Sequence, residues 1–234
     1  MKSIAENIQN VVKDIEGYER LYERGHGSVA LLGASKTQSV EAIIQAYQAG
    51  VRHFGENYLQ EALEKQPLLA QASVQDITWH YIGPIQSRKA RDIAEHFDWV
   101  HSVDRLKVAQ KLSSHRGIDK APLQVCIQVN ISDDPDKSGV TVEQIVPLAQ
   151  QIQALPGLEL RGLMTLPRAE QTLPAQRVLF KLLAQQFKQL QQQMPQIDTL
   201  SMGMSQDMEA AIAEGATFVR IGTGIFGSRK PKTN

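Results

Sequence analysis

The chain has 234 residues, of which 42% are hydrophobic and 21% are charged, a composition typical of a folded protein with a sizeable core. Its 25 basic residues balance its 25 acidic ones, so nothing in the overall charge favours a nucleic-acid or membrane partner. The lone Cys126 excludes an intrachain disulfide. No apolar signal core or membrane-length run is present, and we expect a cytoplasmic protein.

The first elements are well marked. Apolar side chains recur at helical spacing over residues 3–23, which predicts an amphipathic helix before the first strand. Residues 29–34 are uncharged and bounded by turn formers, which is typical of a strand buried on both faces. Thr37 and Ser39 then provide N-caps for a helix that Gly50 ends.

Seven further strands are predicted at residues 53–57, 77–83, 99–103, 123–131, 158–166, 199–204 and 217–221. They alternate with helical patterns, in which Pro67 is expected to disturb a helix end and Pro147 to kink the helix over residues 142–154. Eight strands alternating with helices predict a parallel sheet that closes on itself. We therefore predict an α/β fold: a single (β/α)8 TIM barrel with an extra N-terminal helix, in one domain over residues 1–234.

Lys36 follows the first predicted strand, in a strand-to-helix turn. Ligands of α/β proteins bind at this edge of the sheet. A lysine there is partly desolvated, which lowers its pKa and frees the amine to form a Schiff base with a carbonyl compound. A solvated lysine on the barrel rim is the alternative.

Glycine-rich segments end the last two strands, at residues 201–205 and 221–227. The corresponding loops of barrels frequently hold a phosphate, because glycine lets backbone N–H groups approach an anion and hydroxyls donate further hydrogen bonds. Tight turns that need glycine are the alternative. The second segment also matches a dinucleotide pattern, but too few residues follow it for the rest of that motif.

Arg220 lies in an otherwise apolar strand, where a guanidinium is costly unless it is paired. It either donates to a ligand at the barrel mouth or forms an internal ion pair. No metal site is predicted, because the six histidines lack ligand spacing and the loop that begins at Asp134 has Ile145 where calcium needs a glutamate. His80 is interpreted as a core or rim residue.

Several blocks of the sequence, in this order, match one family: Ala34-Ser35-Lys36-Thr37, Phe54-Gly55-Glu56-Asn57-Tyr58, Trp79-His80-Tyr81-Ile82-Gly83-Pro84-Ile85-Gln86, Lys137-Ser138-Gly139, Arg161-Gly162-Leu163-Met164, Leu200-Ser201-Met202-Gly203-Met204-Ser205 with Asp207-Met208, and Val219-Arg220-Ile221-Gly222-Thr223. Over essentially its whole length the chain resembles the pyridoxal 5′-phosphate (PLP) homeostasis proteins, relatives of the barrel domain of bacterial alanine racemase.

The resemblance implies a set of cofactor-binding residues: Lys36, Asn57, Met164, Ser201, Ser205, Arg220, Gly222 and Thr223. Lys36 would hold PLP as a covalent aldimine. Ser201, with the backbone of Gly222 and Thr223, would take the phosphate.

The other implied residues surround the cofactor ring. Arg220 would face the pyridine nitrogen, and Asn57 and Met164 would line the ring. Ser205 would help to order the phosphate loop. An arginine cannot give up its proton in practice, so it would leave that nitrogen unprotonated and the ring a weak electron sink.

The racemase relatives carry a second, β-rich domain and work as dimers, whereas this chain ends at Asn234, soon after the eighth strand. We therefore expect a monomer that holds, buffers or delivers PLP without robust turnover, in transient contact with PLP-dependent apo-enzymes. Lys137 is a candidate secondary acceptor. The alternatives are a PLP-dependent amino-acid racemase that uses Lys36, and a cofactor-free Schiff-base aldolase.

Overall fold

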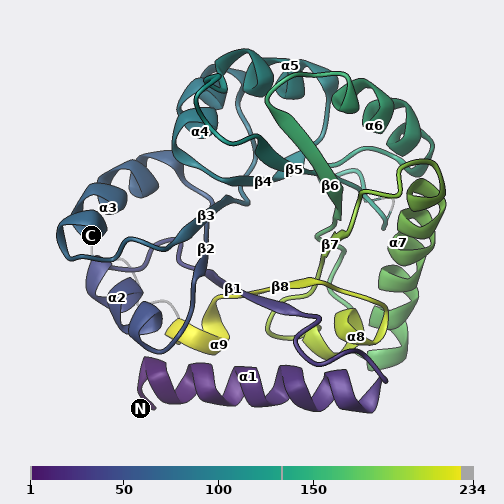
Figure 1. Cartoon of the computed structure of the whole chain (residues 1–234). Helices are drawn as coiled ribbons and strands as arrows, with labels where there is room; N and C mark the ends of the chain where they lie inside the picture. The colour runs from purple at the N-terminus through teal and green to yellow at the C-terminus, as the bar shows by residue number, and fades with distance from the viewer. Residues whose placement is uncertain (1, 133, 228–234) are drawn as a thin grey trace.

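The computed structural model describes residues 2–132 and 134–227. Within them, eight parallel strands close into a barrel in chain order, with β8 paired to β1 (Figure 1). The strands are β1 Ala30–Ala34, β2 His53–Glu56, β3 Thr78–Tyr81, β4 Trp99–Val103, β5 Leu123–Gln128, β6 Leu158–Met164, β7 Thr199–Ser201 and β8 Phe218–Ile221.

Helices surround the barrel wall in Figure 1. They are α1 Ile4–Leu21, α2 Val40–Gln48, α3 Leu59–Gln71, α4 Ala90–His96, α5 Leu106–His115, α6 Ile145–Gln153, α7 Leu173–Gln193, α8 Met208–Ala213 and α9 Thr223–Phe226, with 3-10 helices η1 Ser87–Lys89 and η2 Val142–Gln144. The predicted (β/α)8 TIM barrel with a helix before its first strand is confirmed. None of these helices has the length and hydropathy to cross a bilayer.

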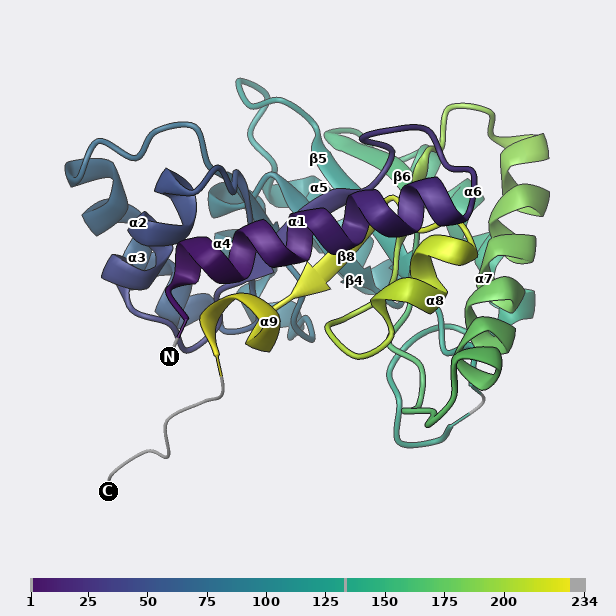
Figure 2. The ribbon, with the colours of Figure 1, turned by 90° about the horizontal axis from the view of Figure 1, so that it is seen from below.

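Helix α1 lies outside the barrel and packs against α2, α8 and α9 (Figures 1 and 2). Ser3 and Glu6 form a capping box that satisfies backbone donors at its start. Its buried face carries Ile8 and Val11, and Asn7 Nδ2 donates to the carbonyl of Ile225 in α9 at 2.9 Å. The N-terminal helix thereby supports the segment that follows β8.

Two separate hydrophobic clusters lie on the two sides of the barrel wall. The larger one contains outward-facing strand residues such as Val219 of β8 together with helix residues such as Phe180 of α7. The smaller one contains no helical residue and fills the barrel interior: Leu32, Ala34, Ile82, Trp99, Cys126, Met164 and Phe218. The alternation of side chains along each strand produces this division.

Strand ends and prolines account for the differences from the predicted elements. β7 ends at Ser201 rather than 204, so the glycine-rich loop begins earlier than predicted. Pro67 does not end its helix; α3 continues to Gln71, because Leu69 beyond the proline is buried against the core. Pro147 falls in the first turn of α6, just after η2, where a missing N–H breaks no helical hydrogen bond.

Candidate functional site

A pocket of about 380 Å³ opens at the carboxyl end of the strands. Its volume is in the range usual for small-molecule sites. Six of the eight residues predicted to bind a cofactor line it: Lys36, Asn57, Ser205, Arg220, Gly222 and Thr223. They come from the ends of β1, β2 and β8 and from the loop after β7, so closure of the barrel brings them together.

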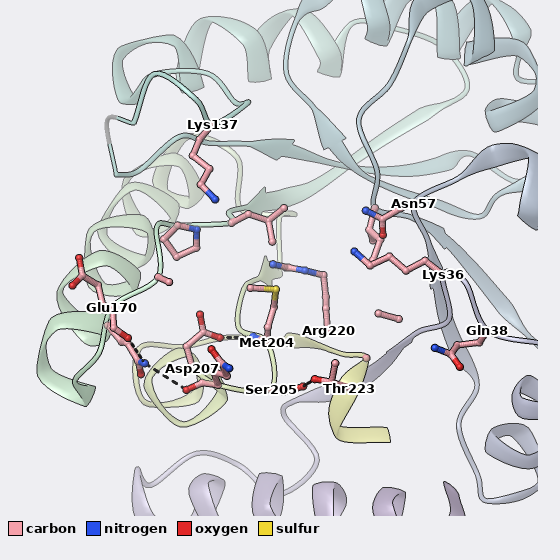
Figure 3. A pocket seen from close by; sticks show the side chains of 18 of the residues that line it. Lys36, Gln38, Asn57, Lys137, Glu170, Met204, Ser205, Asp207, Arg220 and Thr223 are labelled. Atoms are coloured by element: carbon pink, nitrogen blue, oxygen red, sulfur yellow. Dashed lines mark hydrogen bonds between the residues drawn. The ribbon is translucent and has the colours of Figure 1, made fainter. Parts of the chain in front are cut away.

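Lys36 lies two residues beyond the end of β1 and is half-buried. In Figure 3 its amine points across the pocket towards the side chain of Arg220, with Asn57 beside it. The next residue, Thr37, has a φ of 64°, and its N–H donates to Glu61 Oε2 at 2.8 Å. A β-branched residue such as threonine is strained at positive φ. The turn that presents Lys36 therefore adopts a backbone conformation that Thr37 by itself would disfavour.

A buried ion pair braces that turn from the helix side. Lys65 Nζ on α3 donates to the Ser35 carbonyl at 3.0 Å and to Glu56 Oε1 at 2.9 Å. Ser35 Oγ donates to the same carboxylate oxygen at 2.7 Å. Burial raises the pKa of Glu56, and the charge of Lys65 opposes this effect. Because Ser35 immediately precedes Lys36, the network fixes the direction in which the lysine leaves the strand.

Arg220 is 4% exposed and lies at the pocket floor. Its Nη1 donates to Ser201 Oγ at 2.7 Å and its Nη2 to the Thr165 carbonyl at 2.8 Å. Burial lowers the pKa of Arg220 to about 10, so the guanidinium remains charged at neutral pH. Both acceptors are neutral oxygens, and the positive charge is therefore directed to the pocket instead of being cancelled by them.

Ser201 and Met164 lie beneath the pocket. Both side chains are fully buried at the ends of β7 and β6, and neither lines the cavity. Ser201 Oγ accepts from Arg220 and lies 2.7 Å from His101 Nδ1. The direct contact of Ser201 with a phosphate stays a prediction; in the unliganded structure this last side chain of β7 faces the barrel interior. There Ser201 supports Arg220.

The predicted phosphate loops meet through Ser205. Thr223 Oγ1 donates to Ser205 Oγ at 3.3 Å, and the Gly224 N–H donates to the same oxygen at 3.3 Å. Both hydroxyl-bearing residues are exposed to the pocket (Figure 3). Gly203 has a φ of 94°, and a Cβ there would lie 2.5 Å from Ala211 Cβ, so this loop requires glycine. The loops after two successive strands, β7 and β8, thus present paired hydroxyls.

The pocket is also lined by residues that were not predicted from the sequence to form a site. Among them are Gln38, Ile82, Leu166, Pro167, Ala169, Glu170, Gln176, Gln206 and Asp207. Lys137 lies at the edge opposite Lys36 in Figure 3. Burial raises the pKa of Asp207, which accepts a hydrogen bond from the Met204 N–H. Several of these residues follow predicted strands, and that position was the signal available in the sequence.

The donor set fits a phosphorylated aromatic aldehyde such as PLP. Lys36 supplies an amine, Arg220 a fixed N–H donor, and Ser205 with Thr223 a pair of hydroxyls. The Oδ1 atom of Asn57 is buried and has no hydrogen-bond partner among the described residues. A buried acceptor is costly unless it is satisfied, so this atom is suited to a donor on a ligand.

Comparison with known proteins agrees with this geometry. Residues 4–230 match the family model "Alanine racemase, N-terminal domain". A pyridoxal phosphate homeostasis protein of Vibrio cholerae is 51% identical over 235 residues, covering 100% of both chains. The structure of PipY from Synechococcus elongatus with PLP bound is 38% identical, with a TM-score of 0.82, and covers 96% of this chain and 100% of PipY.

Alanine racemase from Corynebacterium glutamicum shares the barrel fold at 16% identity, with a TM-score of 0.68. The match covers 99% of this chain and 62% of the racemase. At this identity the likeness concerns the fold alone, whereas the match to the Vibrio cholerae protein extends over the whole sequence. The chain belongs to the pyridoxal phosphate homeostasis protein family, whose barrel is that of the alanine racemase N-terminal domain.

Proposed function

We propose that the chain binds PLP in the pocket at the barrel mouth, with Lys36 as its covalent attachment point, and serves in PLP homeostasis. One observation carries the proposal. The amine of Lys36 faces a buried guanidinium across a pocket whose further wall carries the paired hydroxyls of Ser205 and Thr223. PipY, which is similar over its full length, binds PLP.

Each residue has a definite task in this proposal. Lys36 Nζ attacks the aldehyde carbon, and the carbonyl oxygen leaves as water. Ser205 donates its hydroxyl proton to the phosphate while Thr223 holds Ser205 in place, and the backbone of Gly222 and Thr223 approaches the anion closely. Arg220 donates to the ring nitrogen and never accepts a proton from it.

The guanidinium of Arg220 also supports a role as a PLP carrier more than a role as an enzyme. Bound PLP would supply an electron sink for a carbanion, and that sink is stronger when the ring nitrogen is protonated. Arg220 can only donate, so it keeps this nitrogen in its unprotonated form. Delivery to apo-enzymes, a monomeric state, a cytoplasmic location and a single domain over residues 1–234 stay predictions of the sequence.

The test is chemical trapping. The protein is incubated with PLP, reduced with borohydride, digested and examined by mass spectrometry. We expect the adduct on the peptide that contains Lys36, and we expect it to be lost in Lys36→Ala and retained in Lys137→Ala. An adduct confined to another lysine would refute the assignment. Protein that stays colourless with PLP and yields no adduct would refute PLP binding.

A second measurement separates the carrier from the racemase. The purified protein is incubated with PLP and an amino acid in deuterium oxide, and exchange at the α-carbon is followed. We expect exchange far below typical enzyme rates of roughly 1–1,000 per second. Turnover within that range would refute the proposed carrier function and support a racemase.

A further inference from the structure

A chain of hydrogen-bonded imidazoles runs through the barrel interior from the pocket floor. His101 Nδ1 lies 2.7 Å from Ser201 Oγ, and His101 Nε2 lies 2.8 Å from His80 Nδ1. His80 Nε2 in turn lies 2.9 Å from His53 Nδ1. His53 is the first residue of β2, so this row of imidazoles extends from Arg220 towards the amino-terminal end of the barrel.

The rings of this chain are packed in place. His80 and His101 are fully buried, and His53 is half-buried. All three lie edge-on to Phe218, with ring centroids 5.3–5.9 Å from it. Burial lowers the pKa of His101 to about 3 and that of His80 well below its ordinary value, so both rings are neutral at pH 7. The described residues form no cluster suited to a metal ion.

A neutral imidazole carries one N–H proton, on either Nδ1 or Nε2. The hydrogen bond from Arg220 to Ser201 determines which nitrogen carries it in this series. The guanidinium can only donate, so it occupies a lone pair of Ser201 Oγ. The serine proton then needs an acceptor. Among the described residues His101 Nδ1 is the acceptor within reach, because Ser201 Oγ has no third partner. The reverse arrangement would leave a buried hydroxyl proton unsatisfied.

This assignment propagates along the chain. If Nδ1 of His101 accepts, its proton lies on Nε2, which donates to His80 Nδ1; His80 Nε2 then donates to His53 Nδ1. The last proton lies on His53 Nε2, which is not among the buried atoms that lack a partner. Each donor from Ser201 Oγ to His80 Nε2 thus has an acceptor, and the direction of donation is the same at all three contacts.

We propose that His101, backed by His80 and His53, is a positioning residue: the three imidazoles share the Nε2–H tautomer and orient Ser201 so that its lone pair holds the Arg220 guanidinium towards the pocket. The consequence for PLP retention rests on the proposed function. The tautomer assignment does not, because it concerns the unliganded chain.

The first test reads the tautomers directly. Nitrogen NMR of histidine-labelled, unliganded protein at pH 7 should show His53, His80 and His101 protonated on Nε2. Ser201→Ala removes the hydroxyl that sets the direction, and we expect it to change the tautomer population of His101. An Nδ1–H tautomer at any of the three in the wild type, or an unchanged His101 in Ser201→Ala, would overturn the proposal.

The second test separates positioning from packing by two replacements at one site. His101→Asn keeps an acceptor at the Nδ1 position but leaves a gap, whereas His101→Leu fills the space and has no acceptor. We expect the PLP dissociation constant to rise about tenfold in His101→Leu, the loss of one buried hydrogen bond, and to stay within about threefold of wild type in His101→Asn. The exposed His115→Asn should match the wild type.

A packing role predicts the opposite order, with the asparagine variant weaker than the leucine variant. That order, or equal affinities of the two, would overturn the positioning role while leaving PLP binding intact. Wild-type protein that does not bind PLP would refute the proposed function, and the NMR result would still decide the tautomers. The two failures are therefore distinguishable.

Discussion

The two sides of the barrel wall differ in chemistry. Outside, strand and helix side chains form one continuous, largely aliphatic layer with residues such as Leu183 and Val219. Inside, a small apolar cluster surrounds three histidines, a serine and an arginine joined by hydrogen bonds. The outer layer can be made by any side chains of suitable volume, whereas the inner one depends on particular donors and acceptors. Stability is therefore expected to depend mainly on the outer layer, and ligand recognition on the inner one.

The largest effect is expected in the outer layer. Phe180 of α7 is fully buried, and Phe180→Ala should lower the free energy of unfolding by about 3–5 kcal/mol, through lost burial and a residual cavity. Urea unfolding measures this loss. Affinity of the folded variant for PLP should not change. A loss of affinity at temperatures where the variant is folded would contradict the division between the two layers.

The inner layer should dominate the response to acid. An unfolded histidine takes up its proton near pH 6.5, whereas burial lowers the pKa of His101 to about 3. Below pH 6.5 the unfolded state binds more protons, so the free energy of unfolding should fall as the pH is lowered, by up to about 1.4 kcal/mol per pH unit for this residue.

The measurement is urea unfolding between pH 6.5 and 4.5. Burial raises the pKa of Glu56 and Asp207, which opposes the histidine effect, so the informative quantity is the difference in slope between wild type and His101→Asn. The variant should have the shallower slope, and the exposed His115→Asn the wild-type slope. Equal slopes in all three proteins would show that His101 is not held neutral in the folded state.

The phosphate contact gives the next effect. Ser205→Ala should weaken PLP binding by about 1.5–3 kcal/mol, or ten- to a hundredfold, by removing a charge-assisted hydrogen bond. Binding of pyridoxal, which lacks the phosphate, should be nearly unaffected. Ser201→Ala acts through Arg220 and should weaken both ligands alike. Absorbance titration with PLP and with pyridoxal measures the dissociation constant of each aldehyde for each of the two variants. A phosphate-dependent defect in Ser201→Ala instead of Ser205→Ala would support the direct phosphate contact of Ser201 predicted from the sequence.

The smallest effect concerns the strained turn after Lys36. Glycine relieves the left-handed conformation of Thr37, which costs about 1–2 kcal/mol, but adds about 0.5–1 kcal/mol of chain entropy to be lost on folding. Thr37→Gly should therefore raise the free energy of unfolding by up to about 1.5 kcal/mol, while Thr37→Ala, which keeps the Cβ, should not. Chemical unfolding of both variants decides the matter, and a stabilised alanine variant would speak against backbone strain.

The fold was predictable because its signals are local. A parallel strand buried on both faces appears as a short apolar run, and each surrounding helix shows its own spacing of apolar residues. The position of Lys36 after the first such run already indicated the ligand edge of the barrel. Arg220 was identifiable for a similar reason, since a charge within an apolar strand requires a partner.

What the sequence by itself determined is the order of strands and helices and the residues at the carboxyl ends of β1 and β8. The tertiary structure decided which face each side chain occupies near a strand end. β7 is short, and this places Ser201 inside the barrel and Ser205 in the pocket. It also decided the imidazole chain, because His101 and Ser201 are 100 residues apart and meet only across the closed barrel. Contacts of that kind depend on strand register and stagger, which no local pattern encodes.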